Sequence, residues 1–181
     1  MAEVFEFLMD RIPTPIGEML VVADAQGNLR ATDWADHEER MHRLLRAHYR
    51  GRVRLVSSRS LNGLTDALGR YFHGELEAID PLPVQTSGTP FQREVWRALR
   101  EIPCGGTISY ARLAERIHRP SAIRAVGFSN GSNPVTVVVP CHRVIGSDGS
   151  LTGYAGGLER KRWLLQHEQR AKPIRAALMK E

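Results

Sequence analysis

The stretch VVVPCHRV, from Val137 to Val144, says most about how this chain folds and what it does. An apolar run ends in a proline and is followed by Cys141, with His142 and an arginine directly after it. A thiol is a strong nucleophile only as a thiolate, which a nearby imidazole or cation favours. The stretch therefore predicts either a nucleophilic Cys141 or a buried structural cysteine after a core strand, and spacing alone does not separate the two.

Polar and glycine-rich residues flank this stretch. Asn133 precedes a proline and suits a turn, whereas residues 153–157 read GYAGG and lack the spacing and charge of a phosphate-binding loop. In the last predicted helix, Glu168 lies one turn beyond two leucines, so it should face inward, where a carboxylate needs a partner. We expect Glu168 to orient His142 and stabilise its imidazolium, with a water linking His142 to Cys141.

Two short helices are predicted before the cysteine, from Tyr110 to His118 and from Pro120 to Phe128. Such a pair is a candidate helix-turn-helix, although plain core packing gives the same pattern. Apart from Arg124, the expected outer face of the second helix has only small residues: Ser121, Ala122, Ala125, Gly127 and Ser129. A helix whose outer face has such small side chains fits into the minor groove, which is about 6 Å wide. It would bind there without recognising a particular base sequence. Arg124 could then occupy the space of a displaced base.

The N-terminal part reads as a scaffold without a catalytic constellation. A hairpin and two amphipathic helices are predicted there, at residues 19–34, 36–49 and 61–72. A proline-containing linker follows from Ile79 to Gly88. Thr89 then begins a helix, with Pro90 at its first position and Gln92 completing a capping box.

Composition limits the possible classes of protein. The chain has 181 residues, enough for one compact body or two small lobes, and contains no apolar stretch of bilayer length. Its start has no secretory signal, so we expect a cytoplasmic protein. Two cysteines, Cys104 and Cys141, give no disulfide framework, and seven scattered histidines show no zinc-ligand spacing. We expect neither a metal nor a cofactor.

The charge is unevenly distributed. Residues 1–88 hold ten Arg and no Lys against thirteen acidic residues, a net charge of −3. Residues 89–181 hold fifteen basic residues against seven acidic ones, a net charge of +8. This asymmetry suggests a polyanion such as nucleic acid as the partner of the C-terminal half, with ordinary solubility as the alternative.

The motifs PCHRVIG, GYAGG and WLLQHE together resemble those of the O6-alkylguanine-DNA alkyltransferase family, the methylated-DNA–protein-cysteine methyltransferases. These DNA-repair proteins move an alkyl group from a damaged base to a cysteine of their own. In the C-terminal half the resemblance rests on specific motifs, whereas in the N-terminal half it is weaker and rests only on the arrangement of the predicted elements. It implies a two-lobed α/β (α+β) fold, with a ribonuclease-H-like domain at 1–88 and a helical, winged-helix-like DNA-binding and alkyl-acceptor domain at 89–170. It also implies a bacterial protein that acts at the nucleoid in the cytoplasm. We expect a loose tail at 171–181, no zinc site and no regulatory domain.

The resemblance also implies roles for individual residues. Cys141 would accept the alkyl group, with His142 and Glu168 forming a relay through water. Arg124 would fill the gap left by a flipped nucleotide, and Tyr110 would help rotate the 3′ phosphate. Further expected contacts with DNA or with the base come from Arg119, Ala122, Ala125, Asn133, Val144, Ser147, Tyr154 and Ala155.

The resemblance implies a specific role for some of these residues. Asn133 would act as a hinge between the DNA-binding helix and the active-site segment. Tyr154 would pack on the base, the backbone around Ala155 would meet O6, and the carbonyl of Val144 would accept from the exocyclic amine. Arg119 would contact a phosphate.

The expected partner is double-stranded DNA that contains O6-alkylguanine or O4-alkylthymine. Because a thioether on Cys141 offers no electrophile to water, the protein should act only once. We expect a monomer in solution and leave cooperative binding on DNA open. Two alternatives remain: a cysteine hydrolase, which would turn over, and a helix-turn-helix regulator without chemistry, which would prefer one DNA sequence.

Overall fold

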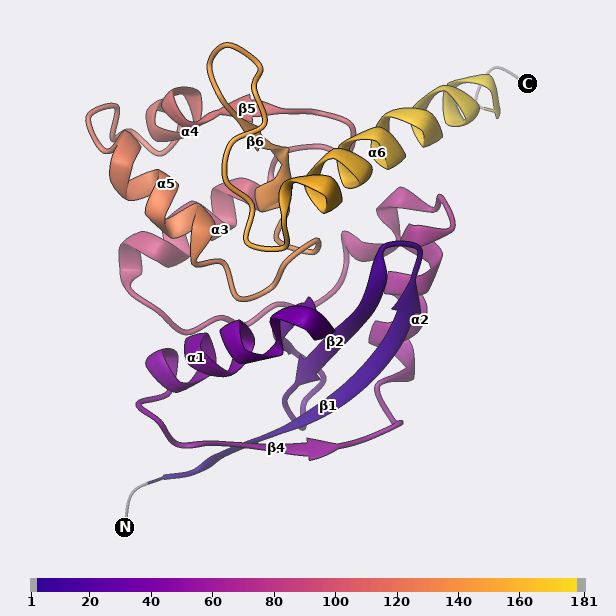
Figure 1. Cartoon of the computed structure of the whole chain (residues 1–181), viewed down its shortest axis with the longest axis vertical. Helices are drawn as coiled ribbons and strands as arrows, with labels where there is room; N and C mark the ends of the chain where they lie inside the picture. The colour runs from indigo at the N-terminus through magenta and orange to yellow at the C-terminus, as the bar shows by residue number, and fades with distance from the viewer. Residues whose placement is uncertain (1–2, 179–181) are drawn as a thin grey trace.

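The computed structural model describes residues 3–178, apart from the side chains of residues 62 and 172–178. A lobe built on a β-sheet lies against a lobe built of helices (Figure 1). The sheet has the strand order β3-β2-β1-β4, in which β1 pairs antiparallel with β2 and parallel with β4. Its strands are β1 (Phe5–Thr14), β2 (Gly17–Ala23), β3 (Leu29–Trp34) and β4 (Val53–Ser57).

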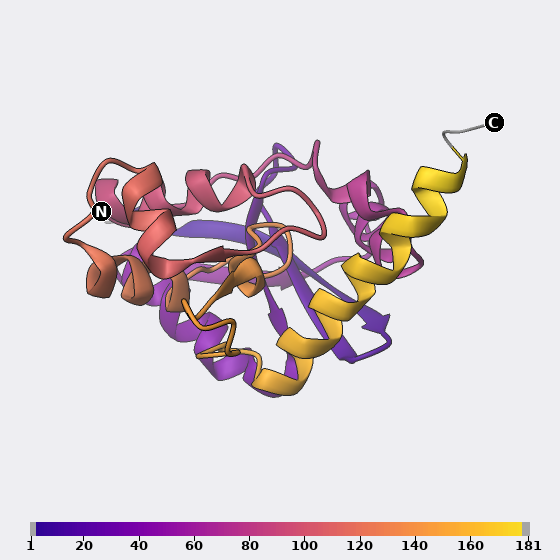
Figure 2. The ribbon, with the colours of Figure 1, turned by 90° about the horizontal axis from the view of Figure 1, so that it is seen from above.

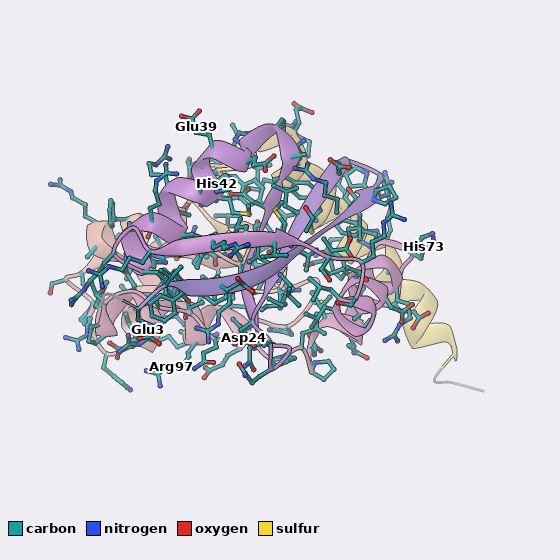
Figure 3. All side chains as sticks on the ribbon, turned by 90° about the horizontal axis from the view of Figure 1, so that it is seen from below. Glu3, Asp24, Glu39, His42, His73 and Arg97 are labelled. Atoms are coloured by element: carbon teal, nitrogen blue, oxygen red, sulfur yellow. The ribbon has the colours of Figure 1, made fainter. Side chains whose placement is uncertain are left out.

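The predicted hairpin is confirmed as β2 and β3, which pair antiparallel with Met19 opposite Trp34. Alternation along β2 gives the sheet two apolar faces. Leu20 and Val22 pack with α1 (Glu38–His48), whereas Met19 and Val21 belong to the larger core that α2 (Asn62–Phe72) shares with the helical lobe. Figure 3 shows Glu39 projecting from α1 away from the sheet.

The helical lobe contains the candidate chemistry. Its elements are α3 (Pro90–Arg100), β5 (Ile108–Ser109), α4 (Tyr110–Arg116), α5 (Ile123–Gly131), β6 (Val144–Ile145) and α6 (Leu158–Leu178). Residues 3–178 also contain three short 3-10 helices: η1 (Ala35–His37), η2 (Leu76–Ile79) and η3 (Cys141–Arg143). The predicted capping box is confirmed, since Thr89 Oγ1 accepts from the Gln92 amide at 3.1 Å and Gln92 Oε1 accepts from the Thr89 amide at 3.0 Å.

The segment before the cysteine is attached to β3. The Thr32 amide donates to the Pro134 carbonyl at 3.0 Å, and the Thr32 hydroxyl donates to the Thr136 carbonyl at 2.6 Å. The predicted linker is also held by β3, since the Leu29 amide donates to the Pro83 carbonyl at 2.8 Å. The sheet of one lobe therefore fixes where the reactive segment of the other lobe lies.

Three expectations from the sequence differ from the structure. The apolar run before Cys141 is not a strand but a buried series of turns, in which Val137 adopts a φ of 71°. The second helix of the predicted pair begins at Ile123 rather than Pro120, because residues 119–122 form a turn in which the Ala122 amide donates to the Arg119 carbonyl at 2.9 Å. The predicted tail begins inside α6, and its residues 179–181 lie outside the described residues.

Helix α6 crosses the molecule and extends beyond it (Figure 2). Its inner face carries Lys161, Leu164 and Glu168, all fully buried. No helix of residues 3–178 is both long and apolar enough to cross a membrane.

Candidate active site

Cys141 is the first residue of η3 and is buried. Its position is set by Asn133, whose side-chain amide donates to the Val139 carbonyl at 2.7 Å and whose Oδ1 accepts from the Val135 amide at 2.9 Å. These bonds close the loop that delivers the cysteine. Inside the loop, the positive φ of Val137 is costly for a β-branched residue and persists only because the surroundings impose it.

The predicted contact between His142 and Glu168 is present. His142 Nε2 lies 2.8 Å from Glu168 Oε1, and both side chains are completely buried. An ionised carboxylate only accepts hydrogen bonds, so Nε2 carries the proton and Nδ1 is left as the acceptor. Nδ1 is buried and has no hydrogen-bond partner among the described residues. The relay is therefore unpartnered at Nδ1, the ring nitrogen that can still accept a proton.

Glu168 receives hydrogen bonds from both lobes. The Tyr71 hydroxyl donates to Oε1 at 2.8 Å, Arg143 donates through Nη2 at 2.9 Å and through Nε at 3.0 Å, and the Gly105 amide donates at 3.3 Å. Burial alone would raise the pKa of Glu168, but His142 and Arg143 hold it well below its usual range. The carboxylate therefore stays charged and can stabilise an imidazolium.

The two reacting groups rest in their neutral forms. Burial raises the pKa of the Cys141 thiol, although Asn133, Arg40 and Lys161 partly counteract it. Burial likewise lowers the pKa of His142, which Glu168 partly offsets. Neighbouring groups therefore do lower the pKa of Cys141, but burial outweighs them in this closed site, so the net shift is upward. A thiol that acts as a nucleophile must first lose its proton, and His142 Nδ1 is a neighbouring acceptor without a partner of its own among the described residues.

The space beside the thiol is nearly closed. A cavity of about 10 Å³ is lined by Cys141, Asn130 and Thr136 on one side and by residues 153–156 on the other. The Tyr154 hydroxyl lies 2.6 Å from Thr136 Oγ1, and Ala155 lines the cavity. A base does not fit in this volume, so residues 153–157, which we call the wall loop, must move before one enters.

Glycine is required within the wall loop. A Cβ atom on Gly156 would lie 2.6 Å from Nε1 of Trp34 and 2.8 Å from the ring of Tyr154, closer than any side chain tolerates. The wall loop therefore packs directly on β3 of the N-terminal lobe.

Lys161 is a buried residue of the site that the sequence interpretation missed. Its Nζ donates to the Val144 carbonyl at 2.6 Å and to the Thr152 carbonyl at 2.8 Å, and so joins β6 to the residue just before the wall loop. The sequence does indicate a buried position for Lys161, because its spacing places it on the same helical face as Leu164 and Glu168. The Val144 carbonyl, expected to bind the exocyclic amine, thus already accepts one hydrogen bond and keeps a second lone pair.

The N-terminal lobe also contributes to the site, contrary to its interpretation as scaffold alone. Arg40 pairs with buried Asp33 at 2.6 Å, and its Nη2 donates to the Gly131 carbonyl at 2.9 Å and to the Asn133 carbonyl at 3.1 Å. Arg40 thus binds the C-terminal end of α5 where the Asn133 loop begins. Together with Tyr71, it connects the sheet lobe to the reactive segment.

The residues expected to meet DNA lie farther out. Tyr110 begins α4, its hydroxyl donates to the Thr152 carbonyl at 3.3 Å, and a Cβ on Gly127 would lie 3.8 Å from its ring. Tyr110 therefore lies between α5 and the residue just before the wall loop. On α5, Arg124 and Ala125 are exposed and Ala122, the N-cap residue, is half-buried.

Two expected contacts lie apart from this group, and the predicted outer face of α5 is partly wrong. Arg119 is exposed and pairs with Glu94 at 3.2 Å, whereas Ser147 is exposed in the turn before the wall loop. Ser129 is buried, and its backbone carbonyl accepts a hydrogen bond from the indole N–H of Trp96 at 2.8 Å. Phe128 is exposed instead.

Within the described part of the chain, no three His, Cys, Asp or Glu side chains are grouped so that they could hold a metal ion.

Comparison with known families adds to this geometry. Residues 90–170 match the family described as 6-O-methylguanine DNA methyltransferase, DNA binding domain, and residues 9–86 match its ribonuclease-like domain. A methylated-DNA–protein-cysteine methyltransferase of Shigella flexneri is 54% identical over 162 residues, which cover 89% of this chain and 95% of the relative.

This chain is also similar to solved structures. The structure of Mycobacterium tuberculosis OGT in complex with DNA superposes with a TM-score of 0.76 at 37% identity, covering 92% of this chain and 94% of that one. A methyltransferase from Pyrococcus kodakaraensis, only 22% identical, has a TM-score of 0.64 over 90% of this chain and 98% of that one, which shows the shared fold. The two matched domains and the similarity over most of the chain establish that this chain belongs to the 6-O-methylguanine DNA methyltransferase family.

Proposed function

We propose that this protein repairs alkylated DNA by direct reversal, with Cys141 as the irreversible acceptor of the alkyl group. The observation that carries the proposal is the open relay, in which a buried cysteine precedes a neutral His142. One ring nitrogen of His142 is held by Glu168, and the other has no partner.

In the proposed reaction the thiol proton passes to His142 Nδ1 through a water, and Glu168 stabilises the imidazolium. The sulfur attacks the alkyl carbon, the bond between that carbon and O6 breaks, and the guanine keeps the electron pair. A proton equivalent to the one lost by the thiol returns to the guanine. Because a thioether cannot be hydrolysed at a carbonyl, each molecule acts once.

Binding of the base requires the wall loop to open. We propose that a flipped guanine separates Tyr154 from Thr136 and then lies between Tyr154 and the Cys141–Val144 segment. The backbone around Ala155 would meet O6, and the carbonyls of Cys141 and Val144 would accept from the exocyclic amine. Asn133 would act as the hinge that connects α5 to Cys141.

The proposed partner is double-stranded DNA. The related M. tuberculosis protein was solved in complex with DNA, which supports this choice. We propose O6-alkylguanine, and O4-alkylthymine as a second substrate, with the protein acting as a monomer in the cytoplasm. The DNA backbone would lie near Ala122, Ala125 and Ser147. Arg119 would leave its ion pair with Glu94 and bind a phosphate instead.

A titration with methylated duplex tests the proposal. Excess DNA containing O6-methylguanine should lose one methyl group per protein molecule, after which the reaction stops. Continued turnover would support a cysteine hydrolase instead. Binding to one preferred DNA sequence without any methyl loss would support a regulator.

Arg124→Ala should slow repair of duplex DNA by about 10²-fold or more, because a flipped base would return to its stack without a side chain to replace it. Reaction with the free base O6-benzylguanine, which needs no flipping, should fall far less. Arg112→Ala is a matched control, since Arg112 is an exposed arginine of α4 that pairs with Glu115. Equal losses of Arg124→Ala on both substrates would show that Arg124 supports the fold instead.

A further inference from the structure

An exposed aromatic ring lies on α5 one helical turn from Arg124. Phe128 is 73% exposed, the highest value among the large apolar side chains that the structure describes. Arg124, Ala125 and Gly131 are exposed as well, at the spacing of one helical face. Val126 and Asn130 are buried beneath them, so α5 is anchored while this face, which we call the α5 stripe, stays open.

A single exposed apolar side chain needs no explanation by itself. The exposure of Phe128 becomes informative because of the residues around it. Arg124, at the i−4 position, makes no ion pair or hydrogen bond with any described residue, and the stripe carries no acidic side chain. The remaining stripe residues, Ala125 and Gly131, are too small to shield the ring. A free cation and a free ring therefore project from the same face of one rigid helix.

We propose that Phe128 is a second wedge, which enters the minor groove beside Arg124 and unstacks or kinks the duplex there. The inference rests on the proposed function, in which α5 lies in that groove. Proteins that bend DNA through the minor groove insert apolar side chains between base steps in this way. One helical turn advances about 5.4 Å and one base pair about 3.4 Å, so Phe128 reaches the duplex one to two base pairs from Arg124.

Charge and area favour DNA over a protein partner. A stable protein interface needs about 800 Å² per partner around an apolar centre. Near Phe128 the only other exposed large apolar side chain of α5 is Ile123, which is 44% exposed. Five positions separate the two along α5, about 140° around the helix, so their side chains do not form one patch. A cation beside a lone ring instead suits a polyanion that offers surfaces for stacking.

The test compares Phe128→Ala, Phe128→Leu and Ile123→Ala with wild type on an undamaged duplex labelled at both ends. Phe128→Ala should weaken binding by about 5-fold to 100-fold and reduce the bend seen by energy transfer between the labels. Phe128→Leu, which retains an apolar wedge, should recover most of both effects. Ile123→Ala should bind and bend the duplex as wild type does. Thermal unfolding of each variant shows whether it is folded.

Two results would overturn the proposal: a folded Phe128→Ala that binds and bends DNA like wild type, or sedimentation showing that wild type is a dimer which Phe128→Ala dissociates. Methyl uptake by wild type from methylated duplex is measured in parallel. If wild type takes up methyl and Phe128→Ala bends DNA normally, only the wedge fails. If wild type takes up none, the proposed function fails, and bending still decides the role of Phe128.

Discussion

Cys141→Ser should abolish alkyl transfer, with a loss of at least about 10³-fold, while affinity for duplex DNA stays near that of wild type. A hydroxyl fits the space of the thiol, so the buried loop held by Asn133 should keep its shape. Serine, however, is far more difficult to deprotonate, and the site offers only a neutral imidazole to do so. Methyl uptake from radiolabelled DNA, measured beside a gel-shift assay, checks both halves of the expectation.

Cys104→Ser is the matched control. Cys104 is half-buried, burial raises the pKa of its thiol to about 11, and its sulfur lies 2.7 Å from Nη2 of Arg143. A serine hydroxyl can accept the same hydrogen bond, so methyl uptake should stay within a few fold of wild type. If Cys104→Ser alone eliminated methyl uptake, the assignment of Cys141 as the acceptor would be wrong.

Glu168→Gln should lower both the rate and the stability. The amide keeps the size of the side chain but removes the charge that balances Arg143 and stabilises the imidazolium of His142. Leaving a buried partner charge unbalanced costs about 3–5 kcal/mol of the free energy of unfolding. The rate of alkyl transfer should fall by about 10²-fold, and alkylation of Cys141 should require a higher pH than in wild type. Denaturant titrations and the pH profile of cysteine alkylation measure these effects.

The stability loss has a defined pH dependence. The pKa of Glu168 is depressed in the folded protein, so its stabilisation is present above the unfolded-state pKa, about 4.3, and is lost as pH falls toward the folded-state value. The difference in unfolding free energy between wild type and Glu168→Gln should be constant near neutral pH and shrink in acid. Glu159→Gln, a change at an exposed carboxylate of the same helix, should alter neither quantity. A pH profile of cysteine alkylation that superimposes on wild type would remove Glu168 from the mechanism.

Local patterns predicted the elements and the inward position of Glu168 well. The hairpin around residues 24–28, the capping box at Thr89 and the buried face of α6 all depend on residues a few positions apart. The inward position of Glu168 follows from its spacing of one helical turn from Leu164 and Leu165. The same spacing also marked Lys161, whose role was missed because a lysine on an apolar stripe is usually taken as surface.

Contacts between the lobes could not be predicted from the sequence. Tyr71 donates a hydrogen bond to Glu168, which is 97 positions later in the sequence, and Arg40 donates one to the carbonyl of Asn133, which is 93 positions later. Nothing near Tyr71 or Arg40 in the sequence marks such a contact, because it depends on how β3 packs against the helical lobe. The apolar run before Cys141 was misread because the Asn133 side chain bends it into turns through hydrogen bonds to Val135 and Val139, which β-propensity does not describe.

The most direct test of the central claim is the mass of the protein after one exposure to duplex DNA containing O6-methylguanine, followed by peptide mapping. The account predicts a gain of one methyl group per chain, located on the peptide that contains Cys141, together with unmodified guanine in the DNA. An unchanged protein mass with continued loss of methyl from the DNA, or a methyl group located on Cys104, would contradict it.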